Sequence, residues 1–338
     1  MHIQPAATRT LALLPAALLV ACSSPTPDAG DSATATPATA AGANSGMTAP
    51  AVAAAPASTI ERFGQGADTA GFQTPESVQY DSAADVFYVS SINGNPSAKD
   101  NNGYIARIPA GETAQGRVIV RGGRNGATLN APKGLAITGD TLWVADIDAV
   151  RGFHKTTGAP LATVDLRAMR TTFLNDVAVG PDGALYVTDT GIRFDASGAM
   201  SQAGTDRVIR VANGRGTVAL AGKSLGNPNG IAYDGANSRF ILVPFNGTDV
   251  MTFRAGDSTT TALVAGPGQF DGVEVLGDGR ILVTSWADSS VNVVRGTTLT
   301  RIVSGANAPA DIGVDTRRNT VAVPLFMDNR VAVYAIPR

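Results

Sequence analysis

Cysteine and histidine are nearly absent from this chain. Its 338 residues include one cysteine, Cys22, and two histidines, His2 and His154. A single cysteine excludes a disulfide within the chain. So few histidines leave no Ser-His-Asp triad. The net charge of −2 argues against a nucleic-acid-binding protein, which usually carries a basic face.

Residues 1–21 are typical of a secretory signal peptide. They combine a weakly basic start with an apolar run over 11–20, which is too short to span a membrane. The run Leu-Val-Ala-Cys that ends at Cys22 resembles a bacterial lipobox, and Ser23 resembles the signal that sorts lipoproteins to the outer membrane. We therefore expect lipidation at Cys22 and a location on the periplasmic side of the bacterial outer membrane. An ordinary signal peptide with an incidental cysteine is the alternative.

Residues 22–57 are rich in Ala, Pro, Thr, Ser and Gly and contain almost no charged or large apolar side chains. Such a segment buries too little apolar surface to offset its ordering entropy, so we expect it to be disordered. A flexible chain of this length spans roughly 30–35 Å root-mean-square. It is predicted to tether a domain over 58–338 to the membrane.

A short phrase recurs six times in that domain. Each copy has a turn, a polar residue, then a small residue or Asp that opens an apolar strand, and the first apolar anchors are Val78, Leu135, Val177, Ile231, Val273 and Ile312. Successive anchors lie 57, 42, 54, 42 and 39 residues apart. Periods near ~40–50 residues with four strands each indicate propeller blades. The sequence therefore predicts an all-β, six-bladed β-propeller.

Closure of the ring can also be predicted. The last blade has only three strands near the C-terminus, and an extra strand-like segment occurs at 60–64. We expect this N-terminal strand to close the last blade, because pairing removes two exposed sheet edges. The segments 91–103 and 191–206 follow second strands and lengthen two of the repeats. They are expected to overhang one mouth of the channel as walls or lids that set specificity.

The first strand of each blade lines the central channel of a propeller, so its opening residues should converge at one mouth. These residues are Glu76, Lys133, Asn175, Asn229, Asp271 and Ala310. Carboxylates and amides are costly to bury unpaired, and their oxygens suit Ca²⁺, Mg²⁺, Mn²⁺ or Zn²⁺. Asn-Gly and Asp-Gly also occur as plain turn formers without any metal. Glu76, a poor turn residue, favours the metal site.

The phrases Glu76-Ser77, Asn175-Asp176, Pro228-Asn229-Gly230 and Asp271-Gly272 together resemble the SMP-30/gluconolactonase/LRE-like family of six-bladed, metal-dependent hydrolases. The resemblance implies that a divalent cation, Ca²⁺ before the other three, is bound by Glu76, Asn175, Asn229 and Asp271. It also implies that Asp271 is the base for an attacking water. A metal-bound carboxylate is a weak base, but the metal has already acidified that water. Asp176 and Asp311 are the reserve candidates.

One departure from the family bears on the substrate. Phe173 stands where the family often has an arginine that contacts a sugar acid, so a general lactone or ester is a more secure expectation than a sugar lactone. Lys133 is expected to neutralise Glu76 or to bind the substrate.

Asp146, Asp189 and Trp286, at the ends of second strands, are expected to line the pocket, with turn stabilisation as the alternative. The resulting hypothesis is a monomeric, lipid-anchored lactone or ester hydrolase that binds no nucleic acid. The alternative is a non-enzymatic propeller of the NHL type that binds a peptide, glycan or protein.

Overall fold

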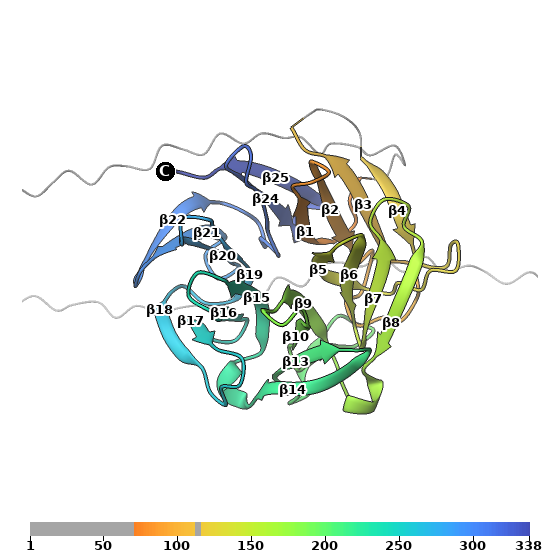
Figure 1. The fold of residues 1–338 in the computed structure, drawn as a ribbon, viewed down its shortest axis with the longest axis horizontal. Coiled ribbons are helices and arrows are strands. Elements are labelled where there is room, and N and C mark those ends of the chain that lie inside the picture. The colour runs from red at the N-terminus through yellow and green to blue at the C-terminus, as the bar shows by residue number, and fades with distance from the viewer. Residues whose placement is uncertain (1–70, 112–115) are drawn as a thin grey trace, which may run out of the picture. The chain divides into compact units, whose positions relative to one another are not determined.

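The computed structural model describes residues 71–111 and 116–338. Its strands form six antiparallel sheets around a common centre, five with four strands and one with three, and a separate two-stranded hairpin (Figure 1). The innermost strands β1, β5, β9, β15, β19 and β23 surround the centre, and the outermost strands lie at the rim. The expected all-β, six-bladed propeller is confirmed.

The strands of the first three blades follow the predicted repeat. Blade 1 consists of β1 (Pro75–Asp81), β2 (Val86–Ser91), β3 (Tyr104–Pro109) and β4 (Arg117–Arg121). Blade 2 consists of β5 (Pro132–Thr138), β6 (Thr141–Asp146), β7 (Ala149–His154) and β8 (Pro160–Asp165), followed by the 3₁₀ turn η1 (Arg167–Met169). Blade 3 consists of β9 (Leu174–Val179), β10 (Leu185–Asp189), β13 (Arg207–Ala212) and β14 (Arg215–Ala221), with the hairpin β11 (Ile192–Phe194) and β12 (Met200–Gln202) inserted.

The remaining blades continue this order around the ring. After the 3₁₀ turn η2 (Lys223–Leu225), blade 4 consists of β15 (Pro228–Asp234), β16 (Arg239–Pro244), β17 (Asp249–Phe253) and β18 (Thr261–Ala265). Blade 5 consists of β19 (Phe270–Val275), β20 (Ile281–Ser285), β21 (Ser290–Arg295) and β22 (Thr298–Ser304). Blade 6 consists of β23 (Gly313–Asp315), β24 (Thr320–Leu325) and β25 (Arg330–Ala335), with η3 (Phe326–Asp328) between the last two.

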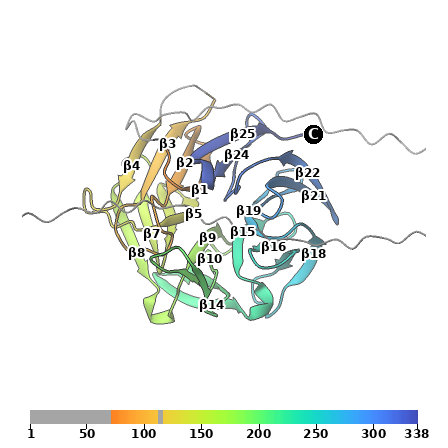
Figure 2. The same cartoon turned by 180° about the vertical axis from the view of Figure 1, so that it is seen from behind.

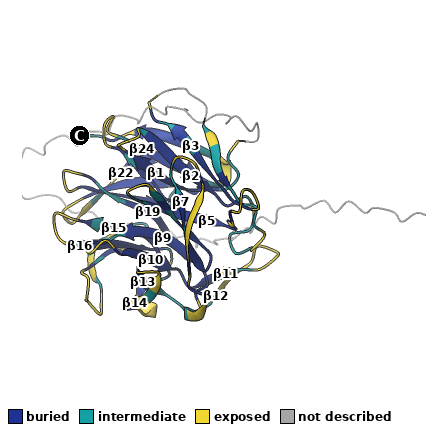
Figure 3. Cartoon of the chain, turned by 45° about the vertical axis from the view of Figure 1, so that its right-hand side comes forward, coloured by how far each residue is buried: buried dark blue, intermediate teal, exposed yellow. Residues whose placement is uncertain are grey.

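Apolar side chains on both faces of each blade make the core. Val86, Tyr88 and Ile105 of blade 1 pack against Leu135 and Val144 of blade 2, and every other neighbouring pair is joined by a similar cluster. Inner strands are therefore buried, and exposure is concentrated in the connecting loops and the outer strands (Figure 3). Because the core is divided among blade interfaces, the channel itself is free to carry polar side chains.

The ring closes between blades 6 and 1 through the inner strands (Figure 2). The Ser77 hydroxyl donates to Asp311 Oδ2 at 2.6 Å, and the backbone N–H of Asp311 donates to the Glu76 carbonyl at 2.9 Å. The predicted closing strand 60–64, the signal peptide, Cys22 and the tether all lie outside the described residues and stay predictions. Within 71–111 and 116–338, no helix is long and apolar enough to cross a membrane.

Close approach of neighbouring inner strands explains three glycines of the repeated phrase. A Cβ on Gly134 would lie 2.5 Å from the Cα of Asp176, and one on Gly230 would lie 2.3 Å from the carbonyl oxygen of Asp271. A Cβ on Gly272 would meet the Cα of Asp311 at 2.6 Å. Only glycine therefore allows these strands to approach closely enough to bring their side chains to one mouth.

A first prediction follows for Gly230. Gly230→Ala should lower the free energy of unfolding by about 1–3 kcal/mol or more, because backbone atoms of blade 5 would have to move. Gly277→Ala is the matched control, since its Cβ meets nothing within 4 Å and its φ is not positive. Urea denaturation measures both; equal stability of the two variants would contradict the proposed close approach.

Candidate active site at the mouth of the central channel

A β-bulge in each of the five four-stranded blades directs the polar residues of the repeated phrase. In blade 4, Pro228 pairs with Pro244 and Ile231 pairs with Leu242, so two residues of β15 oppose one residue of β16. The same register shift occurs at the opening of β1, β5, β9 and β19. A bulge bends the strand and re-aims a side chain. The bulged residues include all the predicted mouth residues except Ala310.

Hydroxyl side chains satisfy the backbone groups that three of these bulges leave unpaired. Thr188 Oγ1 accepts the N–H of Asp176 at 2.8 Å and donates to the Asn229 carbonyl at 2.7 Å. Likewise, Thr284 Oγ1 accepts the N–H of Gly272 at 2.7 Å and donates to the Ala310 carbonyl at 3.1 Å. A buried unpaired amide is costly, so these bonds fix each bulge and join it to the next blade.

The bulged side chains converge on a cavity of about 90 Å³. Its polar lining is Glu76, Lys133, Asn175, Thr190, Asn229 and Asp271. The four residues that family resemblance designated as metal ligands therefore lie around one cavity, together with Lys133, and each is at most 5% exposed. Ala310 is buried and does not line it. Thr190, which the sequence did not signal, contributes a sixth polar group.

The two carboxylates of the cavity are held in an unfavourable setting. Burial, followed by the neighbouring charge of Asp271, raises the pKa of Glu76 well above its usual value. Burial and the charge of Asp176 raise the pKa of Asp271 to about 8, although the indole of Trp286 lowers it. The Oε2 atom of Glu76 is buried without a hydrogen-bond partner. Like charges and an unpaired oxygen of this kind are what a bound cation would relieve.

The two amides are held beside one another by neighbouring groups. Asn175 Nδ2 donates to Thr190 Oγ1 at 3.1 Å and to Asn229 Oδ1, and Asn229 Nδ2 donates to the Phe270 carbonyl at 3.2 Å. An amide oxygen has two lone pairs, so Asn229 Oδ1 keeps one for another partner. Two carboxylates and two amides therefore supply the hard oxygen set that divalent cations prefer.

These four residues fit a divalent cation. Among residues 71–111 and 116–338 no three His, Cys, Asp or Glu side chains are grouped to hold a metal ion. The cavity instead combines two carboxylates with two asparagine amides. Asparagine is not counted among those four residue types, although its amide oxygen can also bind a cation. The unpaired Glu76 Oε2 and the raised pKa values of Glu76 and Asp271 are the observations that favour a cation here.

Lys133 is a fixed charge at the edge of this cavity. Its ammonium donates to the carbonyls of Ala131 at 3.0 Å and Pro96 at 3.1 Å, and it lies 4.2 Å from the ring centroid of Phe173. Burial lowers the pKa of Lys133 to about 8, while the charge of Glu76 raises it. Its hydrogen-bond partners are backbone carbonyls, so Lys133 acts on Glu76 through its charge rather than through a direct bond.

The two long segments after β2 and β10 meet above the mouth. Asn95 Nδ2 donates to the carbonyl of Asp195 at 2.6 Å, and the N–H of Phe194 donates to Ser97 Oγ at 3.0 Å. Blades 1 and 3 are thus bridged across blade 2, and the same loop supplies the Pro96 carbonyl to Lys133. The two long segments therefore lie over the mouth, as expected from the sequence, and each contributes a residue to the cavity lining, Pro96 and Phe194.

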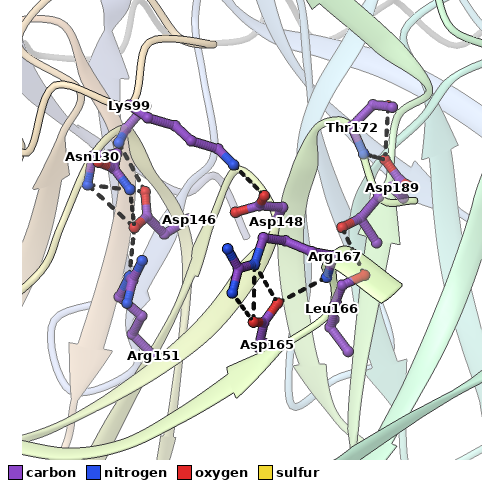
Figure 4. A network of polar contacts seen from close by, with 12 residues as sticks. Lys99, Asn130, Asp146, Asp148, Arg151, Asp165, Leu166, Arg167, Thr172 and Asp189 are labelled. Atoms are coloured by element: carbon purple, nitrogen blue, oxygen red, sulfur yellow. Dashed lines mark hydrogen bonds and ion pairs between the residues drawn. The ribbon is translucent and has the colours of Figure 1, made fainter. Parts of the chain in front are cut away.

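Asp146 and Asp189 do not reach the cavity, whereas Trp286 lines it. Asp146 accepts the N–H groups of Asn130 and Ala131 and pairs with Arg151 Nε at 2.6 Å (Figure 4). The reason is register: Asp146 and Asp189 are the last residues of β6 and β10, while Trp286 follows the last residue of β20. Successive strand residues point to opposite sides. The expectation that all three line the pocket is corrected for the two aspartates.

Asp189 repeats this arrangement in blade 3. Its Oδ1 accepts the N–H group of Thr172 (Figure 4). Oδ1 also accepts the N–H group of Phe173, and Oδ2 pairs with Arg207 at 2.9 Å. Both aspartates anchor the loop that leads into the inner strand of their own blade. They hold the opening residues of β5 and β9 in place from behind.

A second prediction tests this anchoring role. Asp146→Ala should lower the free energy of unfolding by about 3–5 kcal/mol, because it leaves Arg151 partly buried without its partner and two backbone amides unbonded. Asp165→Ala is the control, because Asp165 pairs with Arg167 in an exposed bridge, and exposed ion pairs contribute little to stability (Figure 4). Thermal and urea unfolding of both variants measure the difference. Comparable losses would contradict an anchoring role.

The reserve candidates Asp176 and Asp311 lie deeper along the channel. Asp176 Oδ2 accepts the N–H of Ile231 at 2.7 Å, and Asp311 is bonded to Ser77 and to its own neighbour Ile312. Burial raises the pKa of both, to about 6 for Asp176. They line a cavity of about 440 Å³ that does not include the mouth residues. Their bonds join neighbouring blades, so they position the ring rather than face the mouth cavity.

The fold and the site define a six-bladed propeller with a buried, oxygen-rich cavity at one mouth of its channel. The model of the SMP-30/Gluconolactonase/LRE-like region matches residues 75–312. The chain therefore belongs to that family. A search of curated protein sequences finds no match.

Solved structures share the fold at low sequence identity. A gluconolactonase from Xanthomonas campestris is 17% identical, with a TM-score of 0.60, covering 83% of this chain and 90% of its own. A virginiamycin B lyase from Staphylococcus aureus, solved as a catalytically inactive variant with quinupristin, is 12% identical, with a TM-score of 0.55, covering 83% and 99%. Identities this low establish the shared architecture alone.

Proposed function

We propose that this protein is a hydrolase of a lactone or ester that depends on a divalent cation. The observation that carries the proposal is the convergence of Glu76, Asn175, Asn229 and Asp271 from four blades on one buried cavity, with a carboxylate oxygen left unpaired. Family membership and the fold shared with a gluconolactonase support the same reading. The lipobox at Cys22 supports a lipid anchor on the periplasmic side of the outer membrane.

The residues of the chain divide the chemistry among them. The cation, Ca²⁺ before Mg²⁺, Mn²⁺ or Zn²⁺, would polarise the substrate carbonyl and acidify a water. Asp271 takes a proton from the attacking water as the water oxygen adds to the carbonyl carbon. Asp271 then returns this proton to the leaving oxygen when the C–O bond of the lactone ring or ester breaks. The base must be ionised to accept that proton, and a carboxylate whose pKa is raised to about 8 takes the proton up more readily than an ordinary aspartate once it is ionised.

Two further groups serve the substrate. The Lys133 ammonium adds positive charge beside the cavity, which favours the negative charge that develops on the carbonyl oxygen. The indole N–H of Trp286 is buried without a hydrogen-bond partner, close enough to Asp271 to lower its pKa. It is the donor available to a substrate oxygen.

Metal content and turnover together test the proposal. Purified protein should contain about one divalent cation per chain and hydrolyse members of a lactone and ester panel. A chelator should abolish hydrolysis and lower the melting temperature, and a saturating cation should restore both, since a ligand at 100 times its Kd stabilises by about 2.7 kcal/mol. Protein without metal, without turnover and without a thermal response to any of the four cations would overturn the proposal. That result would favour the non-enzymatic binding propeller.

A further inference from the structure

The mouth cavity is lined by an apolar wall as well as by the polar groups described above. We call this wall the apolar collar; its members are Ile92, Phe173, Phe194, Phe245, Trp286 and Phe326. Four of the six are aromatic phenyl rings and one is an indole. The collar therefore determines which part of a substrate can lie above the candidate ligands.

Four collar residues occupy one equivalent position in four different blades. Ile92, Phe245, Trp286 and Phe326 each directly follow a second strand, namely β2, β16, β20 and β24. In each case the backbone N–H donates to a carbonyl in the loop before the inner strand, at 2.9–3.1 Å. Asp146 and Asp189 are the last residues of their strands and point away from the cavity. The four collar residues come one position later, so their side chains point to the opposite side, toward the axis. Their positions are set by the backbone.

The aromatic rings are packed against one another in two groups. Phe245 meets Trp286 edge to face at a centroid distance of 5.6 Å, and Trp286 meets Phe326 at 5.4 Å. On the blade 3 side, Phe173 meets Phe194 at 5.8 Å. Such contacts limit ring movement, so the collar is a preformed surface.

Polar substituents on a bound substrate would have few partners at this wall. Phenyl and alkyl side chains neither donate nor accept hydrogen bonds, and the Trp286 N–H is a donor alone. A substrate hydroxyl buried without a partner weakens binding by roughly 5- to 100-fold. A sugar lactone would bury several hydroxyl groups here, whereas a hydrocarbon ring would displace water from apolar surface and gain affinity.

We propose that the site selects lactones or esters whose ring or acyl group is hydrocarbon, and discriminates against polyhydroxylated lactones. This inference rests on the proposed hydrolase function and specifies its substrate class. The carbonyl group lies toward the candidate ligands, and the hydrocarbon part lies against the apolar collar. δ-Valerolactone and D-glucono-1,5-lactone are the matched probes, because they share a six-membered lactone ring and differ in hydroxyl and hydroxymethyl substituents.

Binding can be measured apart from turnover with the corresponding lactams, which resist hydrolysis. The chain has two tryptophans, so Trp143→Phe leaves Trp286 as the single reporter of the collar, and Trp286→Phe leaves Trp143 as the control. δ-Valerolactam should change Trp286 fluorescence saturably, and D-glucono-1,5-lactam should bind at least about 10-fold more weakly. The Trp143 reporter should not respond. Equal or tighter binding of the sugar lactam would overturn the inference.

Turnover supplies the second measurement. Wild type should favour δ-valerolactone over D-glucono-1,5-lactone in kcat/KM, and Phe326→Asn should reduce that ratio by about 10-fold or more. Met327→Asn is the control from the same 3₁₀ turn, because Met327 is 61% exposed and does not line the cavity. Phe326→Leu, which keeps the wall apolar, should retain the preference. A ratio unchanged in Phe326→Asn would contradict the role of the collar.

The two measurements separate the two proposals. Selective lactam binding without hydrolysis of either lactone would leave the specificity inference standing and overturn the hydrolase function. Hydrolysis of D-glucono-1,5-lactone in preference to δ-valerolactone would leave the hydrolase function standing and overturn the inference. If Phe326→Asn fails to fold, the wild-type comparison of the two lactams still decides the question.

Discussion

Asp271→Asn is expected to abolish hydrolysis while leaving the propeller folded. The substitution preserves the shape of the side chain but removes a negative charge from the candidate cation site and the group that accepts the proton. Loss of a general base alone costs about 10²–10⁴ in rate, and the weakened cation adds to this. We expect activity at or near background and a divalent-cation Kd raised by about 100-fold, measured by calorimetry and by a lactone assay.

The stability of the same variant should change in the opposite direction. The folded pKa of Asp271, about 8, lies above the value of an unfolded aspartate. The metal-free wild type therefore loses stability as the pH rises from about 4 to about 8, because the carboxyl ionises freely in the unfolded chain but stays protonated in the folded one. Asparagine has no such titration. Metal-free Asp271→Asn should match the metal-free wild type below about pH 4 and exceed its melting temperature increasingly between about pH 4 and pH 8, with no further gain above that range.

Asp278→Asn in the turn of the same blade is the matched control. Asp278 is about half exposed and is paired with Arg280 at 2.7 Å, so its loss should alter neither cation affinity nor turnover. Retention of hydrolysis by Asp271→Asn would remove Asp271 from the chemistry. An unchanged cation affinity would remove it from the candidate ligand set.

The repeat made the architecture predictable from sequence. Each inner strand opens with an apolar anchor such as Val78 or Ile231 at a nearly regular spacing, and that spacing reflects a unit that must bury both faces against its neighbours. The convergence of Glu76, Asn175, Asn229 and Asp271 followed from this topology, because equivalent strand positions in a closed ring face the same axis. Their exact lateral placement depends on the bulges, which depend on pairing with β2, β6, β10, β16 and β20.

Residues outside the repeated phrase were harder to place. Asp146 and Trp286 differ by one position relative to the ends of their strands, and a single step reverses the side-chain direction. No local pattern distinguishes those two positions before the strand ends are known. Phe194 reaches the cavity through a hairpin whose course is decided by contacts with blade 1. Apart from Trp286, the apolar collar was therefore not predicted from the sequence, although it borders the predicted site.

Lys133→Met is expected to move cation affinity and catalysis in opposite directions. Methionine keeps an unbranched apolar chain and removes the ammonium that lies over the Phe173 ring. An ammonium repels a divalent cation in the same cavity, and this repulsion is substantial where water is scarce. Cation affinity should therefore rise by about 10-fold or more. Hydrolysis should fall by about 10- to 100-fold at saturating cation, because positive charge near the carbonyl oxygen is lost.

Lys155→Met provides the matched control for Lys133→Met. Lys155 is also largely buried, but it pairs with Asp81 at 2.9 Å and does not line the mouth cavity. Both variants should lose some stability, since each leaves buried acceptors without their donor, but only Lys133→Met should bind the cation more tightly. If Lys133 serves merely to neutralise Glu76 in a cavity that takes no cation, Lys133→Met will be destabilised and none of Ca²⁺, Mg²⁺, Mn²⁺ or Zn²⁺ will raise its melting temperature. Calorimetric titration of the two variants beside the wild type distinguishes these outcomes, because only a cation site couples the charge at position 133 to metal affinity.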